Sequence, residues 1–398
     1  MDQRYDVIII GAGPAGTITA KKCAEYGLKV LVLEKRPEIG APKRCAEGIG
    51  HQDLERLGYT GKEQFIAQTI DGGLFITPDG SSIELPGGQG GYVLERKVFD
   101  KYLAYDASKA GAKIYTKADA FDLIRTDGII SGVRVNYNGE QKEIYGNMLV
   151  AADGVESKIS RIAGLPTRNT KNTLDAGYQY EMANIDISDH HKLYFYVGTG
   201  IAPGGYIWIF PKGAHIANVG ICIGSNHEKT AKYYLDNWID THPEIKKGSI
   251  IEENCGAIPV GGFLSVMTTD NFLAVGDAAH QVNPLHGGGL QEASFSAEIA
   301  SAVIKQAIDS CDTSKAALDT YNTLWWEKRG KKLQDVEKVV NIYRRVSDSD
   351  LNMITKAFSG QDIVDLACGK THKLLKILIK NPKLATFVKY LNYSEGKK

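Results

Sequence analysis

Long hydrophobic runs are absent from this sequence of 398 residues. A membrane-spanning helix needs about 17–25 consecutive apolar residues, and no such stretch occurs. The first strand signal begins at Tyr5 and leaves no room for a cleavable signal peptide before it. We therefore expect a cytoplasmic protein that associates with a membrane only peripherally.

A charge excess and a dense set of cysteines are also missing. The 47 basic and 47 acidic residues balance, so no overall field favours nucleic acid as a partner. The cysteines lack the paired spacing of zinc ligands, which indicates free thiols in a reducing compartment and argues against a metal site or a disulfide framework. They are Cys23, Cys45, Cys222, Cys255, Cys311 and Cys368. There is no internal repeat, and the length suggests two or three domains.

The first forty residues contain a dinucleotide-binding pattern. An apolar strand over residues 5–10 leads into Gly11, Gly13 and Gly16, and a helix is expected over about residues 14–26. Glycines at this spacing permit a tight turn, let the backbone approach a pyrophosphate and let the helix pack closely on the strand. The alternative interpretation is a structural turn without a nucleotide, and the pattern alone does not choose between NAD and FAD.

A second strand, over residues 29–34, ends at Glu34. This acid follows the glycine turn at the distance where a carboxylate accepts hydrogen bonds from a ribose diol. Glu34 therefore favours an unphosphorylated adenosine ribose.

Two later strands end in similar turns. Residues 148–161 run from an apolar strand through Asp153 and Gly154 into a helix, and residues 272–280 form a second apolar strand that ends at Gly276 and Asp277. An acid in such a turn can accept hydrogen bonds from ribityl or ribose hydroxyls. Gly289 follows, with a helix expected from Leu290, and a helix N-terminus can face a ring carbonyl.

A loop over residues 35–48 joins the second strand to the rest of the chain. Its small residues Cys45, Ala46 and Gly48 would let the backbone contact a flat ring system, although an ordinary surface connection has the same composition.

Two further positions are candidates for cofactor contacts. Arg96 precedes a helix whose apolar spacing begins at Phe99, where it could hold a pyrophosphate or simply be exposed. Ala120 is small and lies near a strand end, where an adenine could approach the backbone.

An aromatic strand lies between the second and third turns. Alternation places Tyr206, Trp208 and Phe210 on one face of it. The face is either a wall of a binding site or part of the core of a sandwich.

Together the GxGxxG, the D-G-x-x-S-x-x-x-R over residues 153–161 and the GDA at residues 276–278 resemble the hydroxylase-type flavoprotein superfamily, which implies FAD rather than NAD. The P-x-x-Y-x-W-x-F-P pattern of residues 203–211 and the Cys45 loop resemble the geranylgeranyl reductases, in particular the archaeal digeranylgeranylglycerophospholipid reductases. Flavin halogenases have a related W-x-W-x-I-P strand, but Tyr206 and Phe210 depart from it. By the resemblance, the flavin contacts are Ala15, Glu34, Cys45, Ala46, Gly48, Arg96, Ala120, Asp277, Gly289 and Leu290, beside the three glycines.

The resemblance implies an α/β architecture with a three-layer, Rossmann-like FAD domain that is discontinuous in sequence. We assign it residues 1–50, 95–165 and 265–313. A β-rich substrate domain is expected over residues 51–94 and 166–264, and a helical C-terminal region over residues 314–398.

The end of the chain is basic. Residues 370–393 contain six lysines and no acid, interleaved with apolar residues, which is typical of an amphipathic segment at a membrane surface or of an ordinary solvated helix. We expect Lys370, His372 and Lys373 to meet the phosphate of a lipid head group and an anionic membrane.

The resemblance implies reduction of isolated C=C bonds in the geranylgeranyl chains of an archaeal ether phospholipid, with the aromatic strand as a wall and Cys45 influencing proton delivery. The electron donor is unidentified, with ferredoxin, NAD(P)H and a deazaflavin as the choices. The alternatives are a flavin-dependent aromatic hydroxylase and a non-catalytic prenyl-lipid carrier with a structural flavin.

Overall fold

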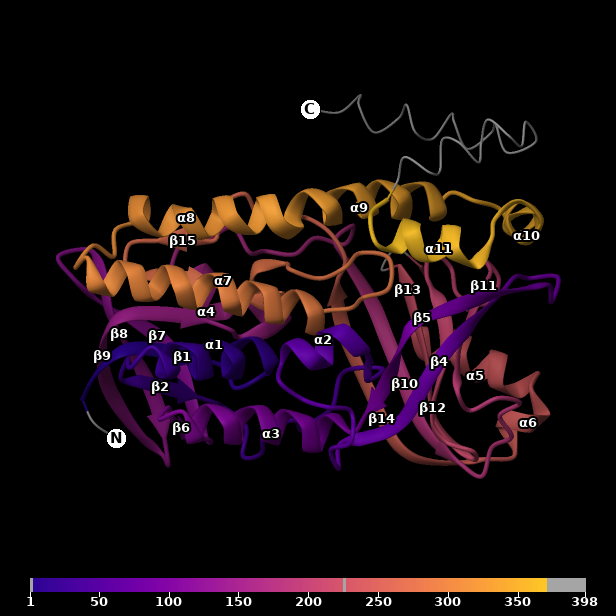
Figure 1. The fold of residues 1–398 in the computed structure, drawn as a ribbon, viewed down its shortest axis with the longest axis horizontal. Coiled ribbons are helices and arrows are strands. Elements are labelled where there is room, and N and C mark those ends of the chain that lie inside the picture. Colours follow the sequence, from indigo (N-terminus) through magenta and orange to yellow (C-terminus); the bar gives the residue numbers. More distant parts are fainter. Residues whose placement is uncertain (1–2, 225–226, 371–398) are drawn as a thin grey trace.

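The structure is a computed structural model that describes residues 3–224 and 227–370. Two eight-stranded sheets lie side by side along the long axis of the molecule, with a row of helices along one edge (Figure 1). The architecture is α/β, as expected.

The first sheet is mainly parallel and has the order β15-β16-β9-β1-β2-β6, with β7 and β8 continuing from β9 as an antiparallel meander. Its strands are β1 (Arg4–Ile10), β2 (Val30–Leu33), β6 (Lys113–Tyr115), β7 (Ala118–Thr126), β8 (Ile129–Tyr137), β9 (Glu140–Ala151), β15 (Thr268–Thr269) and β16 (Phe272–Ala274). Strands β1 and β2 are apolar runs buried on both faces, as is usual for central parallel strands. Strands β6 and β7 are separate because the chain turns between them at Lys117, which has φ 54°.

Helices α1 (Pro14–Glu25), α3 (Arg96–Lys109) and α7 (Leu290–Asp309) accompany this sheet, and α1 contacts both of the others. Pro14 suits the first turn of α1, where its missing N–H costs nothing. Gly27, with φ 80°, follows the C-cap at Tyr26 and ends the helix. The short helix α4 (Lys158–Ile162) contacts β7 of this sheet, whereas the short helix α2 (His51–Arg56) contacts the second sheet.

The second sheet has the order β14-β10-β13-β12-β11-β4-β5-β3. Its strands are β3 (Gly48–Gly50), β4 (Ile66–Ile76), β5 (Ser82–Leu94), β10 (Leu174–Ala183), β11 (Lys192–Val197), β12 (Tyr206–Gly213), β13 (Ile216–Gly224) and β14 (Ser249–Pro259). Strand β3 falls within the segment 1–50 that the sequence assigns to the FAD domain, yet it pairs with β5 in the second sheet. The proposed domain boundaries otherwise remain a prediction.

The two faces of the second sheet differ. On one face, Ile207 and Ile209 of β12 join a core with α5 (Ala231–Asp240) and α6 (Pro243–Lys246). On the other, Trp208 and Phe210 pack with Val93 and Cys222. The alternation expected for this strand is therefore present, with the aliphatic residues forming the covered core.

The C-terminal helices run along the upper edge in Figure 1 and then fold over the second sheet. They are α8 (Lys315–Trp325), α9 (Lys331–Tyr343), α10 (Asp348–Ala357) and α11 (Gly360–Ala367). A π-helical turn over Trp326–Gly330 joins α8 to α9. Gly330 is required there, because a Cβ would lie 2.6 Å from the ring of Trp326 and 2.7 Å from that of Trp325.

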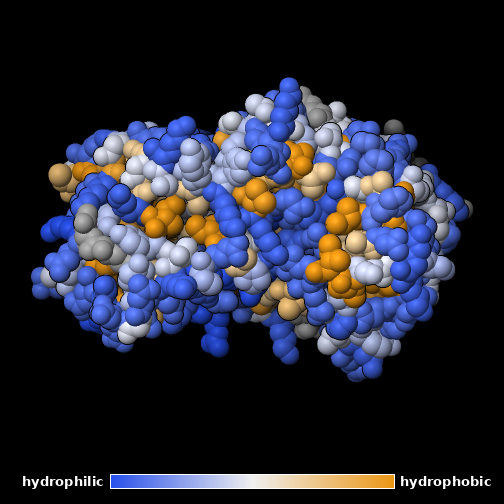
Figure 2. Space-filling view, turned by 90° about the horizontal axis from the view of Figure 1, so that it is seen from below, coloured by the Kyte–Doolittle hydropathy of each residue, from blue (hydrophilic) through white to orange (hydrophobic). Residues whose placement is uncertain are grey.

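Within the described part of the chain, none of the helices has the length and hydrophobicity to cross a bilayer. Figure 2 shows one face of the molecule, on which hydrophobic residues form separate groups among hydrophilic ones.

Candidate active site

A large cavity lies between the two sheets, with a volume of about 870 Å³. Its walls come from the glycine turn before α1, the loop around Cys45, residues 275–291, the aromatic face of β12 and the C-terminal helices. The cavity therefore joins the dinucleotide pattern to the aromatic strand, although almost two hundred residues separate them in the sequence.

The glycine turn is built by close backbone contacts. Gly11 has φ 105°, and a Cβ on it would lie 2.2 Å from the carbonyl oxygen of Ala152. A Cβ on Gly16 would lie 2.0 Å from the carbonyl oxygen of Gly11. A Cβ on Gly13 would instead meet no atom within 4 Å, and both Gly13 and Ala15 line the cavity. The turn is packed on its inner side and open on the side that faces the cavity.

Two helix N-termini meet this cavity. Helix α1 begins after Gly13 and α7 begins after Gly289, and neither has a side-chain cap. The first N–H groups of such helices are free to bind anions or carbonyl oxygens. Asp277, Gly289 and Leu290 also line the cavity, and burial raises the pKa of Asp277 above its usual value. These residues fit FAD, whose diphosphate and ring carbonyls need donors of this kind.

Glu34 lies at the end of β2, beside the glycine turn. One carboxylate oxygen accepts the N–H of Ala12 at 2.9 Å, and the other accepts the N–H of Arg36 at 2.9 Å. Each oxygen keeps a further lone pair for a ribose hydroxyl. Ala120 lies in β7, whose residue Ala118 donates its N–H to the carbonyl of Glu34 at 2.9 Å, and is buried, but neither it nor Glu34 lines the cavity. Their contacts with a nucleotide remain predictions.

The loop around Cys45 lies over the cavity. Cys45, Ala46 and Gly48 all line it, and the thiol of Cys45 accepts the N–H of Glu47 at 3.2 Å. Glu47 is fully buried and has φ 77°. The buried side chain of Glu47 therefore helps to hold the loop in place.

Arg96 also lines the cavity, but its guanidinium already has a partner. Nε and one terminal nitrogen donate to the two carboxylate oxygens of Asp100 at 2.7 and 2.9 Å. Burial alone would lower the pKa of Arg96, but Asp100 and the nearby Cys45 outweigh burial and raise it. A contact of Arg96 with the flavin remains a prediction, and the pair with Asp100 uses two of the five N–H groups of the guanidinium.

The aromatic wall consists of Tyr206, Trp208 and Phe210, and all three line the cavity. The Tyr206 hydroxyl donates to the carbonyl of His286 at 2.8 Å, and the indole N–H of Trp208 donates to Oε1 of Gln179 at 2.9 Å. Each polar atom of the wall thus has a partner, and the ring surfaces remain available to an apolar ligand.

The far end of the cavity is apolar apart from one ion pair. The C-terminal helices contribute side chains such as Tyr343, Ile354 and Phe358. Arg344, the residue after α9, donates to Asp175 at 2.6 Å, and Asp175 lines the cavity. Burial raises the pKa of Asp175 from 3.8 to about 6, although Arg344 acts in the opposite direction.

This raised pKa predicts a pH dependence of stability. The folded carboxyl of Asp175 keeps its proton to a higher pH than the unfolded one, so the free energy of unfolding should fall as the pH rises from about 4 to about 6. Asp175→Asn should lack this contribution. Urea denaturation should therefore show a difference between wild type and variant that changes by roughly 2–3 kcal/mol over this range. A difference that is constant with pH would contradict the assignment.

The basic end of the chain is only partly described. Lys370 donates to Asp365 at 2.9 Å and is exposed, two residues after Cys368, which lines the cavity. Lys370 itself is not part of the lining. His372 and Lys373 lie outside the described residues.

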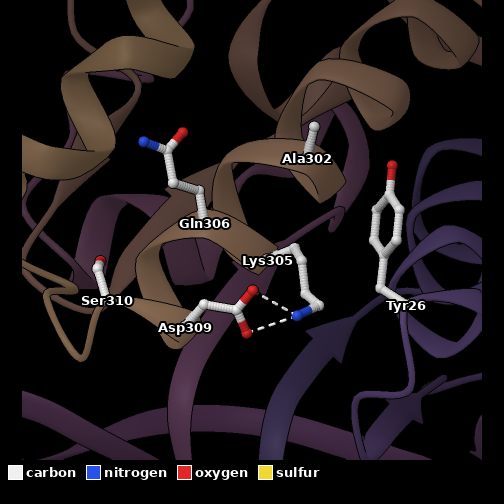
Figure 3. Close-up of a pocket in the computed structure, with 6 residues that line it drawn as sticks. All are labelled: Tyr26, Ala302, Lys305, Gln306, Asp309 and Ser310. Carbon is white, nitrogen blue, oxygen red and sulfur yellow. Dashed lines mark hydrogen bonds and ion pairs between the residues drawn. The ribbon is translucent and has the colours of Figure 1, made fainter.

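A second hollow lies at the other end of α7, with a volume of about 590 Å³ (Figure 3). Its lining includes Tyr26, Gln306 and the ion pair of Lys305 with Asp309. At 1.5 Å per residue, Lys305 lies about 22 Å along the helix from Leu290. This hollow is therefore separate from the cofactor cavity.

The sequence pattern did not identify the polar residues beneath the wall. Gln179 and Asn218 are buried and lie on the cavity-facing side of β10 and β13. The sequence did contain a signal for these polar residues. Asp175, Gln179 and Glu181 are separated by even numbers of positions in one strand, so their side chains share one face.

Comparisons with known proteins agree with this geometry. Residues 173–258 match the model of the geranylgeranyl reductase catalytic domain, and residues 9–46 match that of an NAD(P)-binding Rossmann-like domain. A digeranylgeranylglycerophospholipid reductase of Methanosphaera stadtmanae is 40% identical over 94% of this chain and 96% of its own length. The corresponding protein of Methanocella arvoryzae is 38% identical over 96% of this chain and 98% of its own length.

The fold agrees as well. A crystal structure of a geranylgeranyl bacteriochlorophyll reductase-like protein from Thermoplasma acidophilum is 35% identical, with a TM-score of 0.90 over 98% of this chain and 99% of that one. A flavin-dependent brominase shares only the fold, at 18% identity and a TM-score of 0.73 over 92% of this chain and 94% of that one. The identity and coverage of its relatives place this chain in the digeranylgeranylglycerophospholipid reductase family.

Proposed function

We propose that this protein is an FAD-dependent reductase that saturates isolated C=C bonds in the geranylgeranyl chains of an archaeal ether phospholipid. The observation that carries the proposal is the large cavity, which joins a dinucleotide cradle at one end to an apolar, aromatic-walled space at the other. The names of the relatives support the same substrate class.

The residues of the cradle suit each part of the cofactor. The N-terminus of α1 at Gly13 would hold the diphosphate, Glu34 the adenosine ribose, and the N-terminus of α7 at Gly289 and Leu290 a ring carbonyl. When bound and reduced, FAD supplies the hydride equivalent for the alkene.

The rest of the cavity serves the lipid. An isolated alkene offers no charge, so its binding depends on apolar surface, at about 0.8 kcal/mol per buried CH₂. Tyr206, Trp208 and Phe210 align the chain and exclude water. Cys45 borders the same space and is the proposed influence on proton delivery.

We assign the binding of the lipid head group and of the membrane to the basic end of the chain. Lys370, His372 and Lys373 are the proposed contacts for the lipid phosphate and an anionic bilayer, where each lysine contributes about 1 kcal/mol. Lys370 is paired with Asp365, so a phosphate has to compete with that carboxylate. The candidates for the immediate electron donor are ferredoxin, NAD(P)H and a deazaflavin.

A direct assay tests the proposed reaction. The purified protein, reduced with dithionite, is incubated with unsaturated archaeal phospholipid, and the lipid is analysed by mass spectrometry. We expect a mass gain of one H₂ per saturated double bond, with none when dithionite is omitted. Product that gains oxygen in the presence of NAD(P)H and O₂ would instead establish a hydroxylase, and bound flavin that no reductant reduces would indicate a carrier.

A further inference from the structure

One row of residues crosses the second sheet beneath the aromatic wall. Gln179 of β10 pairs with Gly220 of β13, and Gly220 pairs with Trp208 of β12. Gly220 has no side chain, and a Cβ there would lie 2.3 Å from the indole of Trp208. The indole therefore lies across the glycine and reaches the side chain of Gln179, to which its N–H donates at 2.9 Å.

The amide nitrogen of Gln179 binds the Cys45 loop. Nε2 of Gln179 donates to the carbonyl of Cys45 at 3.2 Å and to Oδ1 of Asn218 at 3.2 Å. Asn218 in turn donates to the carbonyl of Ala46 at 3.2 Å and to Glu47 at 2.7 Å. Two buried amides thus connect the wall to the loop opposite it.

The hydrogen-bonding groups fix the orientation of the glutamine. An indole N–H only donates, so it must face Oε1, and a carbonyl only accepts, so it must face Nε2. Gln179 is 4% exposed, and a buried donor or acceptor that loses its partner destabilises the folded protein. An apolar side chain of similar size would leave both Trp208 and Cys45 with an unsatisfied polar group.

We propose that Gln179 is a positioning residue that sets the separation between the aromatic wall and the Cys45 loop. This inference rests on the proposed function, in which the lipid chain lies beside both. The substrate does not need Gln179 for affinity, because the apolar lining supplies that. It needs the wall and the loop at a fixed distance, and small displacements of a bound group lower the rate of reaction more than they lower binding.

The inference predicts that a change at Trp208 alters the reactivity of Cys45, although these two residues have no hydrogen bond with each other. Gln179→Leu should increase the rate at which iodoacetamide alkylates Cys45, because the carbonyl of Cys45 loses its restraint. Trp208→Phe should change this rate in the same direction, since it removes the indole donor that orients the amide. Peptide mass spectrometry distinguishes Cys45 from the five other cysteines.

The double variant provides the decisive comparison. In the Gln179→Leu background, Trp208→Phe should have no further effect on Cys45 alkylation, because the connection is already broken. With lipid, Gln179→Leu should lower kcat about tenfold or more and leave KM within about twofold, as expected for misplacement rather than lost binding. Gln306→Leu, an exposed glutamine in the second hollow, is the matched control and should behave as wild type.

The alkylation measurement uses no substrate, so it tests the inference even if the proposed reaction is not observed. Unchanged Cys45 reactivity in both folded single variants would overturn the proposal, and so would additive effects in the double variant. If Gln179→Leu does not fold, Trp208→Phe alone decides, because it leaves the glutamine in place and is a smaller change. Retention of flavin in each variant shows that the cofactor cradle is intact.

Discussion

Replacing Lys212 with methionine should lower the free energy of unfolding by about 3–5 kcal/mol, because it leaves two buried carboxylates, Glu47 and Glu181, with Lys43 as their one shared cation. The side chain of Lys212 is 1% exposed, and its ammonium lies 3.1 Å from Glu47, 3.1 Å from Glu181 and 2.7 Å from Glu95. Burial alone would lower the pKa of Lys212, but these acids outweigh it and raise the pKa, so the charge is retained. Its contribution is present below the unfolded pKa and is lost only as the pH rises through the raised folded value.

Two control variants show whether burial is the cause. Lys232→Met removes an exposed lysine paired with Asp236 at 2.9 Å, and an exposed pair is worth at most about 1 kcal/mol. Adding Glu181→Gln to Lys212→Met should recover part of the lost stability, because Lys43 then faces one buried carboxylate, Glu47, instead of two. Guanidinium denaturation of all three variants measures the differences. Equal losses in Lys212→Met and Lys232→Met would contradict the buried-charge explanation.

Replacing Gly13 with valine should yield a folded protein that has lost at least about nine-tenths of its flavin, a loss of roughly 1.4 kcal/mol or more in binding. The backbone of Gly13 has φ −71°, which any residue adopts, and no protein atom lies within 4 Å of its Cβ position. The added side chain therefore projects into the cavity, where a pyrophosphate would approach the backbone. Absorbance of the purified protein gives the flavin content.

Gly200→Val is the matched control for this prediction. Gly200 also has no atom within 4 Å of its Cβ position, and it lies outside the cavity lining. Flavin content should be normal in that variant. After removal of the flavin, both variants should melt at the temperature of flavin-free wild type. Full flavin occupancy in Gly13→Val would place the cofactor elsewhere.

The sequence predicts best the parts that local signals determine. The expected helix over residues 14–26 is α1, Pro14–Glu25, because proline at the start and glycine after the end mark its limits. The alternation of the aromatic strand likewise predicts which residues of β12 face together. Both inferences need only neighbouring positions in the chain.

Contacts between distant segments are the parts that the sequence does not reveal. The pairing of Gln179 with both Cys45 and Trp208 depends on strand register, and so does the place of β3 in the second sheet. The pairing of Arg96 with Asp100 was within reach, because residues four apart on a helix are neighbours. The contact of Arg96 with the flavin stays a prediction.

The place of β1 in the first sheet also affects how the chain folds while it is being synthesised. Its two partners are β2, which follows almost at once, and β9, whose residue Tyr145 pairs with Arg4. At about 5–20 residues per second, a ribosome needs on the order of ten seconds to make the intervening chain. During that interval a hydrophobic strand has one unpaired edge, which is the kind of surface that recruits other chains. A nascent chain of this protein is therefore exposed to aggregation until β9 emerges, and early binding by a chaperone would protect that edge.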